Sequence, residues 1–231
     1  MRRLVLFDID GTLLSAGGSG KRAFRDALVE VFGTPGPIDG YSFAGRTDPQ
    51  IARELLAADG VEPGRIDAGM DALWEAYLPR FEREIAAAEV RVLPGVRALV
   101  ERVEAAGNGV MLGLLTGNVR EGARLKLERA GLGFRRFRVG AYGSDHADRP
   151  ELPAVAVARA RELTGHVYRG KEIVIVGDTP FDVACGEHLG VRTIAVATGG
   201  HAEDELAACA PDHLFADLAD TDRVWEAIAG E

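Results

Sequence analysis

The run LVLF at residues 4–7, followed at once by DIDG at residues 8–11, decides how this chain of 231 residues folds. A short, unbroken apolar run that stops at a turn signal predicts a strand buried on both faces, as in a parallel sheet. Similar runs recur along the chain, the last of them weaker, at residues 110–115, 173–176, 191–196 and 137–139. We predict that these runs are the strands of one parallel sheet.

Helical patterns lie between these strands, with apolar residues spaced three and four apart. They are found at residues 94–106, 119–130, 153–163 and 181–189. Strands that alternate with helices of about ten residues indicate βαβ units with right-handed crossovers. We predict an α/β fold with a doubly wound, Rossmann-like parallel sheet.

The segment of residues 15–89 interrupts this alternation, because it contains helical patterns and turns but no strand-like run. Helices are predicted at residues 21–32, at 48–58 with Asp48 as the N-cap and Pro49 in the first turn, and at 66–87 with an interruption near Pro79. Connections between elements usually take about 2–6 residues. We therefore predict an inserted all-helical cap domain over residues 15–89, on a core of residues 1–14 and 90–231. The glycine cluster at residues 17–20 is its predicted hinge.

Charge and composition disfavour several classes of partner. The chain has 27 Lys and Arg against 36 Asp and Glu, and its formal net charge of −9 repels nucleic-acid backbones and anionic membrane surfaces. Its two cysteines, Cys185 and Cys209, lack metal-ligand spacing, which fits a reducing compartment. We find neither a leader sequence nor an apolar run of about 18 residues. We expect a soluble cytoplasmic protein that binds a small molecule.

Polar residues follow three of the predicted strands directly. In open α/β sheets, ligands bind beyond the carboxyl ends of the strands, near the point where the strand order reverses. Asp8 and Asp10 follow the first strand, the sequence TGN at residues 116–118 follows the second, and Asp178 follows the strand at 173–176, with Asp182 four residues later. The fold would therefore bring four carboxylates and a hydroxyl to one edge of the sheet.

Carboxylates gathered in this way need a counter-charge. Two unit charges about 4 Å apart repel by roughly 4 kcal/mol at an effective dielectric constant of about 20, and crowded carboxylates raise one another's pKa values. A set of oxygen ligands without His or Cys suits Mg²⁺. We predict a Mg²⁺ site formed by Asp8, Asp178 and the main-chain carbonyl of Asp10, with Asp182 acting behind these ligands or through water.

The spacing of Asp8 and Asp10 indicates a division of roles. Residues i and i+2 of an extended strand face the same side, so one carboxylate can ligate metal and attack as a nucleophile while the other serves as an acid. Attack on phosphorus would give an acyl phosphate. Thr116 and the main-chain amides of Gly117 and Asn118, at a predicted helix start, would hold the phosphate oxygens.

The motif DIDGTL at residues 8–13 resembles the signature of the haloacid dehalogenase superfamily of phosphotransferases. Thr116 after an apolar strand, and GDTPFD at residues 177–182, resemble the second and fourth motifs of that superfamily. Their order covers nearly the whole chain, and the helical insert is similar to the cap of the phosphoglycolate-phosphatase-like and β-phosphoglucomutase-like branch. The resemblance implies that Asp8 is the nucleophile and Asp10 the general acid and base.

The superfamily also places a basic residue before the strand that leads to its fourth motif. It neutralises the nucleophile and the phosphoryl group. Arg149-Pro150 resembles the Lys-Pro pair of close relatives, whereas Lys171 lies too near the buried strand and Lys126 lies in the middle of a helix. We predict that Arg149 is this residue, since a guanidinium can engage two phosphate oxygens at once.

Substrate choice would come from the cap. Arg46 stands in the sequence GRTD just before a predicted cap helix, in a loop able to project over the cleft. We predict that Arg46 contacts the non-phosphate part of the substrate, such as an acidic group.

We therefore predict a Mg²⁺-dependent phosphomonoester hydrolase that acts on a small phosphorylated metabolite through an aspartyl-phosphate. A sugar phosphomutase shares every core motif and is the main alternative. A haloacid dehalogenase is disfavoured, because related dehalogenases lack an acid at the position of Asp10. A non-catalytic phospho-receiver module needs about half this length and no lid. The segment GGSGK at residues 17–21 departs from the P-loop pattern at Ser15 and Arg22.

Overall fold

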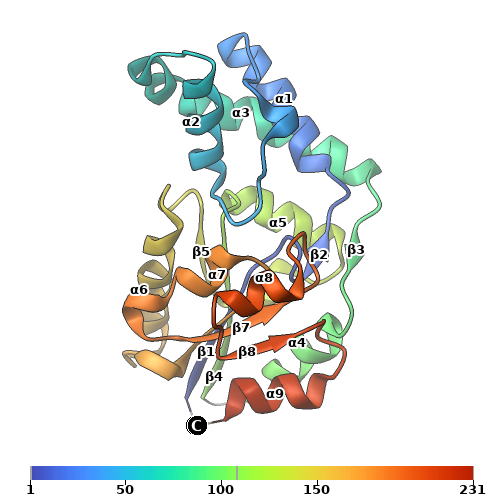
Figure 1. Cartoon of the computed structure of the whole chain (residues 1–231), viewed down its shortest axis with the longest axis vertical. Helices are drawn as coiled ribbons and strands as arrows, with labels where there is room; N and C mark the ends of the chain where they lie inside the picture. Colours follow the sequence, from blue (N-terminus) through green and yellow to red (C-terminus); the bar gives the residue numbers. More distant parts are fainter. Residues whose placement is uncertain (1, 108, 231) are drawn as a thin grey trace.

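A parallel sheet of six strands forms the centre of the protein, in the order β5-β4-β1-β6-β7-β8 (Figure 1). The computed structural model describes residues 2–107 and 109–230. The strands are β1 (Arg3–Phe7), β4 (Val110–Thr116), β5 (Val139–Tyr142), β6 (Ile173–Gly177), β7 (Arg192–Val196) and β8 (His213–Phe215). Each neighbouring pair is parallel. The predicted α/β fold is confirmed.

Helices cover both faces of the sheet, because the side chains of its central strand β1 are apolar on both sides. Val5 and Phe7 belong to the core on one face, together with residues of α4, α5 and α9. Leu4 and Leu6 belong to the core on the other face, together with residues of α6. These helices are α4 (Val96–Ala105), α5 (Arg120–Arg129), α6 (Leu152–Thr164) and α9 (Thr221–Ala229). The sheet is therefore doubly wound, as predicted.

The strand order reverses beside β1. After β1 the chain forms β4 and β5 on one side, and it then returns to form β6, β7 and β8 on the other. A crevice for ligands is expected at the carboxyl ends of the strands where the order reverses. In this fold those are the ends of β1, β4 and β6.

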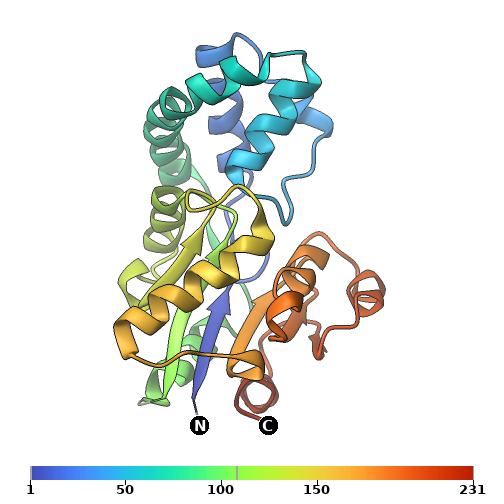
Figure 2. The ribbon, with the colours of Figure 1, turned by 90° about the vertical axis from the view of Figure 1, so that its left-hand side faces the viewer.

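The chain between β2 (Leu14–Ser15) and β3 (Arg91–Val92) is helical and stands beyond the carboxyl ends of the sheet (Figures 1 and 2). Its elements are α1 (Ser19–Phe32), the 3-10 turn η1 (Ile38–Gly40), α2 (Asp48–Ala58) and α3 (Pro63–Ala87). Strands β2 and β3 pair antiparallel, Leu14 with Val92, where the chain leaves and re-enters the core. The division into cap and core domains, and the glycine hinge, stay predictions.

The interruption predicted near Pro79 is wrong, because the single helix α3 runs through this proline. Pro79 is exposed, so its ring disturbs the solvent side. On the opposite side Tyr77 and Phe81 are buried with their rings stacked, 5.4 Å between centroids. This packing outweighs the lost backbone hydrogen bond.

Among the described helices, none combines the length and apolarity needed to cross a membrane.

Two predicted elements have other bounds than expected. The helix predicted at 181–189 is the short α7 (Pro180–Ala184), followed by the 3-10 turn η5 (Glu187–Leu189). Gly186 separates them, in close contact with the side chains of Val191 and Ile175. The weak strand expected at 137–139 is β5, which begins at Val139 because the 3-10 turn η2 (Phe134–Arg136) precedes it. Helix α8 (Glu203–Ala208) follows β7.

Candidate active site

The carboxyl ends of β1, β4 and β6 meet at a cavity of about 370 Å³. Asp8 follows β1, Thr116 ends β4 and Asp178 follows β6, and all three line the cavity. The predicted residues that line it are Asp8, Asp10, Arg46, Thr116, Gly117, Asn118, Arg149 and Asp178. The fold thus brings together residues that are far apart in the sequence.

Three carboxylates gather beside this cavity, of which Asp8 and Asp178 line it and Asp182 lies outside its lining. Asp8, Asp178 and Asp182 are buried, and each has a carboxylate oxygen within 4.8 Å of those of the other two. Burial raises the pKa of Asp8 to about 7, against the attraction of Arg149. Burial, and then repulsion by Asp182 and Asp8, raises the pKa of Asp178 to about 8. These three carboxyl groups therefore resist full ionisation.

Arg149 supplies part of the missing positive charge. It lies in the short 3-10 helix η3 (Arg149–Glu151) and is 3% exposed. Its Nη2 donates to Asp182 Oδ1 and lies 3.4 Å from Asp8 Oδ1. Burial lowers the pKa of Arg149, but the carboxylates of Asp182 and Asp8 outweigh this and keep it above its ordinary value. Its Nε is buried without an acceptor among the described residues, so the site is short of one acceptor.

Asp182 and Asp178 differ in how much of each carboxylate is already engaged. Both oxygens of Asp182 accept hydrogen bonds, Oδ1 from Arg149 and Oδ2 from the main-chain N–H and hydroxyl of Thr179, at 3.0 and 2.6 Å. Asp178 Oδ1 accepts from the hydroxyl of Thr12 at 2.9 Å. A Cβ on Gly11, whose φ is +79°, would lie 2.3 Å from Asp178 Oδ2. The DIDG motif therefore needs glycine at position 11 for two reasons: the turn has a positive φ there, and any side chain would collide with Asp178.

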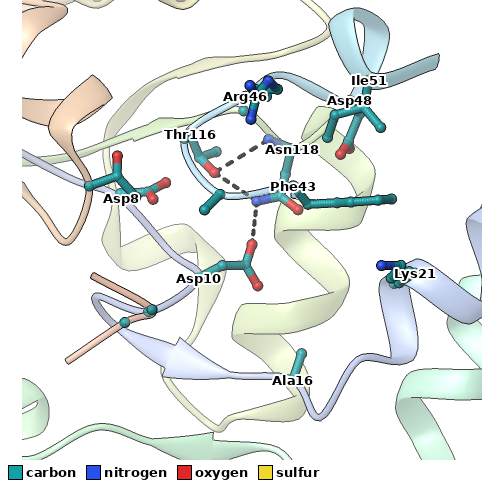
Figure 3. Close-up of a pocket in the computed structure, with 18 of the residues that line it drawn as sticks. Asp8, Asp10, Ala16, Lys21, Phe43, Arg46, Asp48, Ile51, Thr116 and Asn118 are labelled. Carbon is teal, nitrogen blue, oxygen red and sulfur yellow. Dashed lines mark hydrogen bonds between the residues drawn. The ribbon is translucent and has the colours of Figure 1, made fainter. Parts of the chain in front are cut away.

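Asp10 belongs to a second group of polar side chains. Its Oδ2 accepts from Asn118 Nδ2 at 2.8 Å and from Lys126 Nζ at 2.6 Å. Asn118 Nδ2 also donates to Thr116 Oγ1 at 2.7 Å. Figure 3 shows the Asp10 side chain pointing toward Asn118, with Asp8 set to one side. Asp8 and Asp10 line one cavity as expected, but their carboxylates have different partners.

Two main-chain amides near Thr116 already have acceptors. Asn118 N–H donates to Thr116 Oγ1 at 3.4 Å, and Val119 N–H donates to Asp48 Oδ2 at 2.8 Å. Asp48 was expected only as a helix cap, and this expectation is wrong. The N-cap of α2 is Thr47, whose hydroxyl accepts from Gln50 N–H. Asp48 instead joins the helical part of the chain to the start of α5, and burial raises its pKa to about 6.

Residues 45–48 rest directly on the core. Asp48 N–H donates to the carbonyl of Gly117 at 2.8 Å, and the hydroxyl of Thr47 donates to the carbonyl of Ala147 at 2.5 Å. The guanidinium of Arg46 lies over two rings, 5.3 Å from the centroid of Tyr41 and 5.4 Å from that of Phe181 in α7. Its Nε is 3.6 Å from Glu54 Oε2, so its charge is paired. This loop therefore forms part of the cavity wall and is fixed to the core.

The helical part also contributes a second cation to the cavity. Lys21 of α1 lines it, and its Nζ donates to main-chain carbonyls of Asp39 and Tyr41 at 3.2 and 3.3 Å. Figure 3 shows Lys21 and Asp48 across the pocket from Asp8. Sequence reasoning did not identify Lys21, Thr12 or Lys126 as site residues. For Lys126 a signal existed, since it shares the buried side of α5 with Ala123 and Leu127.

A doubly wound sheet with buried carboxylates and a threonine at its strand ends, and with a buried arginine beside them, defines an α/β enzyme with an acidic active site. A model of the haloacid dehalogenase-like hydrolases matches residues 5–196. The chain therefore belongs to that family, and the resemblance of its motifs is confirmed.

Two relatives agree with this assignment, and a solved structure agrees with the fold. The chain is 30% identical to a phosphoglycolate phosphatase of Rhodospirillum rubrum over 226 residues, covering 95% of this chain and 89% of that protein. It is 29% identical to a phosphonoacetaldehyde hydrolase of Paraburkholderia xenovorans over 231 residues, covering 92% and 82%. The fold matches CbbY of Rhodobacter sphaeroides, solved with xylulose-(1,5)-bisphosphate, with a TM-score of 0.72, 20% identity and coverage of 95% and 96%.

Proposed function

We propose that the protein is a Mg²⁺-dependent phosphomonoester hydrolase that acts on a small phosphorylated metabolite in the cytoplasm through an aspartyl-phosphate on Asp8. The observation that carries this proposal is the position of Asp8. Its carboxylate is buried beside Arg149 at the sheet edge, in the same cavity as Asp10 and Thr116. A nucleophile, an acid, a cation and a hydroxyl donor therefore surround one space.

The reaction would proceed in two displacements. In the first, an Asp8 oxygen attacks phosphorus, the bond from phosphorus to the leaving oxygen breaks, and that oxygen takes the electron pair and a proton from Asp10. In the second, Asp10 takes a proton from water, whose oxygen attacks the phosphorus, and the bond to Asp8 breaks. One phosphomonoester and one water thus give one alcohol and inorganic phosphate. The loop of residues 45–48 would exclude bulk water during both steps.

The acidic cluster fits a Mg²⁺ ion. Its donor atoms are carboxylate oxygens, which Mg²⁺ prefers, and the raised pKa values of Asp8 and Asp178 indicate that the cluster lacks positive charge. Asp8 and Asp178 would hold the ion with the Asp10 carbonyl, whereas the engaged oxygens of Asp182 suit a role in holding Arg149. When bound, the ion would neutralise charge on the phosphoryl group.

We expect Mg²⁺ to raise the melting temperature of the wild type. At about 10–100 times its Kd, the ion would add about 1.4–2.7 kcal/mol to the free energy of unfolding, or roughly 3–10 °C for a chain of this size. Asp178→Ala should abolish the shift, because it removes a carboxylate that would hold the ion. Differential scanning calorimetry with EDTA and with Mg²⁺ measures this. Asp71→Ala, an exposed change on α3, should keep the full shift, and an equal shift in Asp178→Ala would place the ion elsewhere.

We infer that the substrate carries a second anionic group beside its phosphate. Lys21 and Arg46 place two cations in the wall of the cavity, and the partner of Arg46, Glu54, does not line it, so an anionic group of the substrate would compete with Glu54 for Arg46 from the cavity side. Phosphoglycolate and xylulose-1,5-bisphosphate, named with two of the similar proteins, both carry such a group. The direct test is the release of inorganic phosphate from a panel of these two compounds, phosphonoacetaldehyde and a hexose 1-phosphate. Conversion of the hexose 1-phosphate to its 6-phosphate would identify a mutase instead, and a single phosphorylation without turnover would identify a receiver module.

Arg46→Ala is expected to raise KM for the best substrate about ten-fold or more, because a charge-assisted hydrogen bond to an anion contributes about 1.5–3 kcal/mol. Its kcat/KM for p-nitrophenyl phosphate, which lacks a second anion, should change less than about three-fold. Steady-state kinetics on both substrates measures this split. The matched control is Arg53→Ala, an exposed arginine of α2 paired with Asp67. Equal losses on the two substrates would show that Arg46 serves loop closure alone.

A further inference from the structure

Lys126 is a buried lysine in the middle of α5, at 6% exposure. Lysine is almost never buried unless it is paired, because removal of its charge from water is unfavourable. Its Nζ donates to Asp10 Oδ2 at 2.6 Å and to Asn118 Oδ1 at 2.5 Å, and it lies 5.7 Å from the ring centroid of Phe81. Its charge is therefore committed to the cavity and not to the surface of the helix.

The contacts of Lys126 determine how Asn118 is oriented. A lysine ammonium can only donate hydrogen bonds, so it fixes the amide oxygen of Asn118 toward itself. The amide nitrogen must then face the other way, where it donates to Asp10 Oδ2 and Thr116 Oγ1 at 2.8 and 2.7 Å. Lys126 thus acts on Asp10 twice, directly and through Asn118.

Both donors converge on one oxygen of Asp10. Oδ2 accepts from Asn118 and from Lys126, whereas the side chain as a whole is 45% exposed. A carboxylate fixed by two donors on one oxygen presents its other oxygen to the cavity in a single direction. Proton transfer requires such placement, because the donor must lie within hydrogen-bond reach of the leaving oxygen.

The two buried cations of the site serve different carboxylates. Arg149 contacts Asp8 and Asp182, whereas Lys126 contacts Asp10. Removal of Lys126 would therefore disturb proton transfer without removing a cation from the phosphoryl and metal side. This separation makes its role measurable.

We propose that Lys126 is a positioning residue for proton transfer, which holds the Asp10 carboxylate in the orientation that serves the leaving oxygen of the substrate. The proposal rests on the phosphatase function proposed above. Lys126 exchanges no proton with the substrate. It acts through Asp10, so its importance depends on how much the leaving group needs a proton.

The test compares two leaving groups in Lys126→Met, which keeps most of the length of the unbranched side chain and removes its charge. The readout is kcat/KM, which reports only the steps through formation of the aspartyl-phosphate, because Asp10 also serves the later hydrolysis that both substrates share. With an alkyl phosphate, whose leaving oxygen needs a proton, kcat/KM should fall on the order of 10²-fold, as expected for loss of general acid catalysis. With p-nitrophenyl phosphate, whose leaving group departs as an anion, kcat/KM should fall less than about ten-fold. Lys171→Met, the same change at a lysine paired with Asp212 outside the cavity, should leave both values unchanged.

A double-mutant cycle with Asp10→Asn completes the test. If Lys126 acts through Asp10, Lys126→Met should lower kcat/KM for the alkyl phosphate less than about two-fold in the Asp10→Asn background. The double variant no longer leaves the Asp10 carboxylate without its lysine, so it keeps the test valid if Lys126→Met alone fails to fold. Equal losses of kcat/KM on both leaving groups, or a full further loss in the double variant, would overturn the proposal.

A measurement without turnover separates this proposal from the proposed function. In ¹⁵N NMR spectra, the side-chain amide protons of Asn118 should exchange slowly with water in wild type and Lys171→Met, and much faster in Lys126→Met. Unchanged exchange in Lys126→Met overturns the positioning role, even in an active phosphatase. If the wild type hydrolyses none of the phosphates, the phosphatase function is overturned. Faster exchange of the Asn118 amide protons in Lys126→Met than in wild type would then still support the positioning of Asp10.

Discussion

Asp8→Asn is expected to abolish phosphate release, with kcat reduced by on the order of 10⁴-fold or more, the scale seen when an enzyme loses its nucleophile. Asparagine keeps the shape of the side chain but cannot form the acyl phosphate. The measurement is release of inorganic phosphate from the best substrate. Mass spectrometry of acid-quenched wild type should find a phosphoryl group on the peptide that contains Asp8, and no such group in the variant.

The folded state should survive this change. Burial already raises the pKa of Asp8 to about 7, so a neutral side chain relieves an unfavourable charge. In EDTA at pH 8, the melting temperature of Asp8→Asn should be at least that of wild type. Asp71→Asn, an exposed change, is the control for handling and folding. Activity above one tenth of wild type in a folded Asp8→Asn protein would refute the assignment of the nucleophile.

Arg149→Leu is expected to lower the free energy of unfolding by about 3–5 kcal/mol, the loss typical when one partner of a buried ion pair is removed. Arg149 is 3% exposed and contacts both Asp8 and Asp182. The variant would leave two buried carboxylates without their cation, and turnover should fall with it. Urea denaturation in EDTA measures the stability, and Arg149→Lys, which keeps the charge, should recover part of it.

The same variant should lose more stability at pH 8 than at pH 6. Arg149 lowers the pKa of Asp8, which burial has raised to about 7, so its removal raises that pKa further. A carboxyl whose pKa is raised in the folded state favours folding at low pH, and this contribution is lost as the pH rises through the folded pKa. A loss of stability independent of pH between 6 and 8 would show that Asp8 does not depend on Arg149.

The sequence predicted the residues whose place is set by the backbone alone. Asp8, Thr116 and Asp178 each come at or just after the end of a parallel strand, and parallel strands bring such ends to one edge. Arg149 was found through a motif, and the structure places it beside Asp8. Their catalytic and metal-binding roles stay predictions.

The sequence was less informative where the reach of a long side chain sets the position of a charged group, or where tertiary packing sets the length of a helix. The sequence places Lys126 in the middle of a helix, but its ammonium group extends from the buried side of α5 to Asp10. Pro79 predicts a helix break, but the buried stripe of Tyr77 and Phe81 keeps α3 continuous. In both cases a contact with a distant segment overrides the local signal.

The contact of residues 45–48 with the core has a consequence for how this enzyme family can diversify. A Cβ on Gly117 would lie 2.0 Å from the carbonyl oxygen of Arg46, so the loop meets the core backbone to backbone. The hydrogen bond from Asp48 N–H to the Gly117 carbonyl is likewise independent of side chains. Side chains that line the cavity, such as Tyr41 and Ile51, can therefore be exchanged during evolution while the loop keeps its contact with the core.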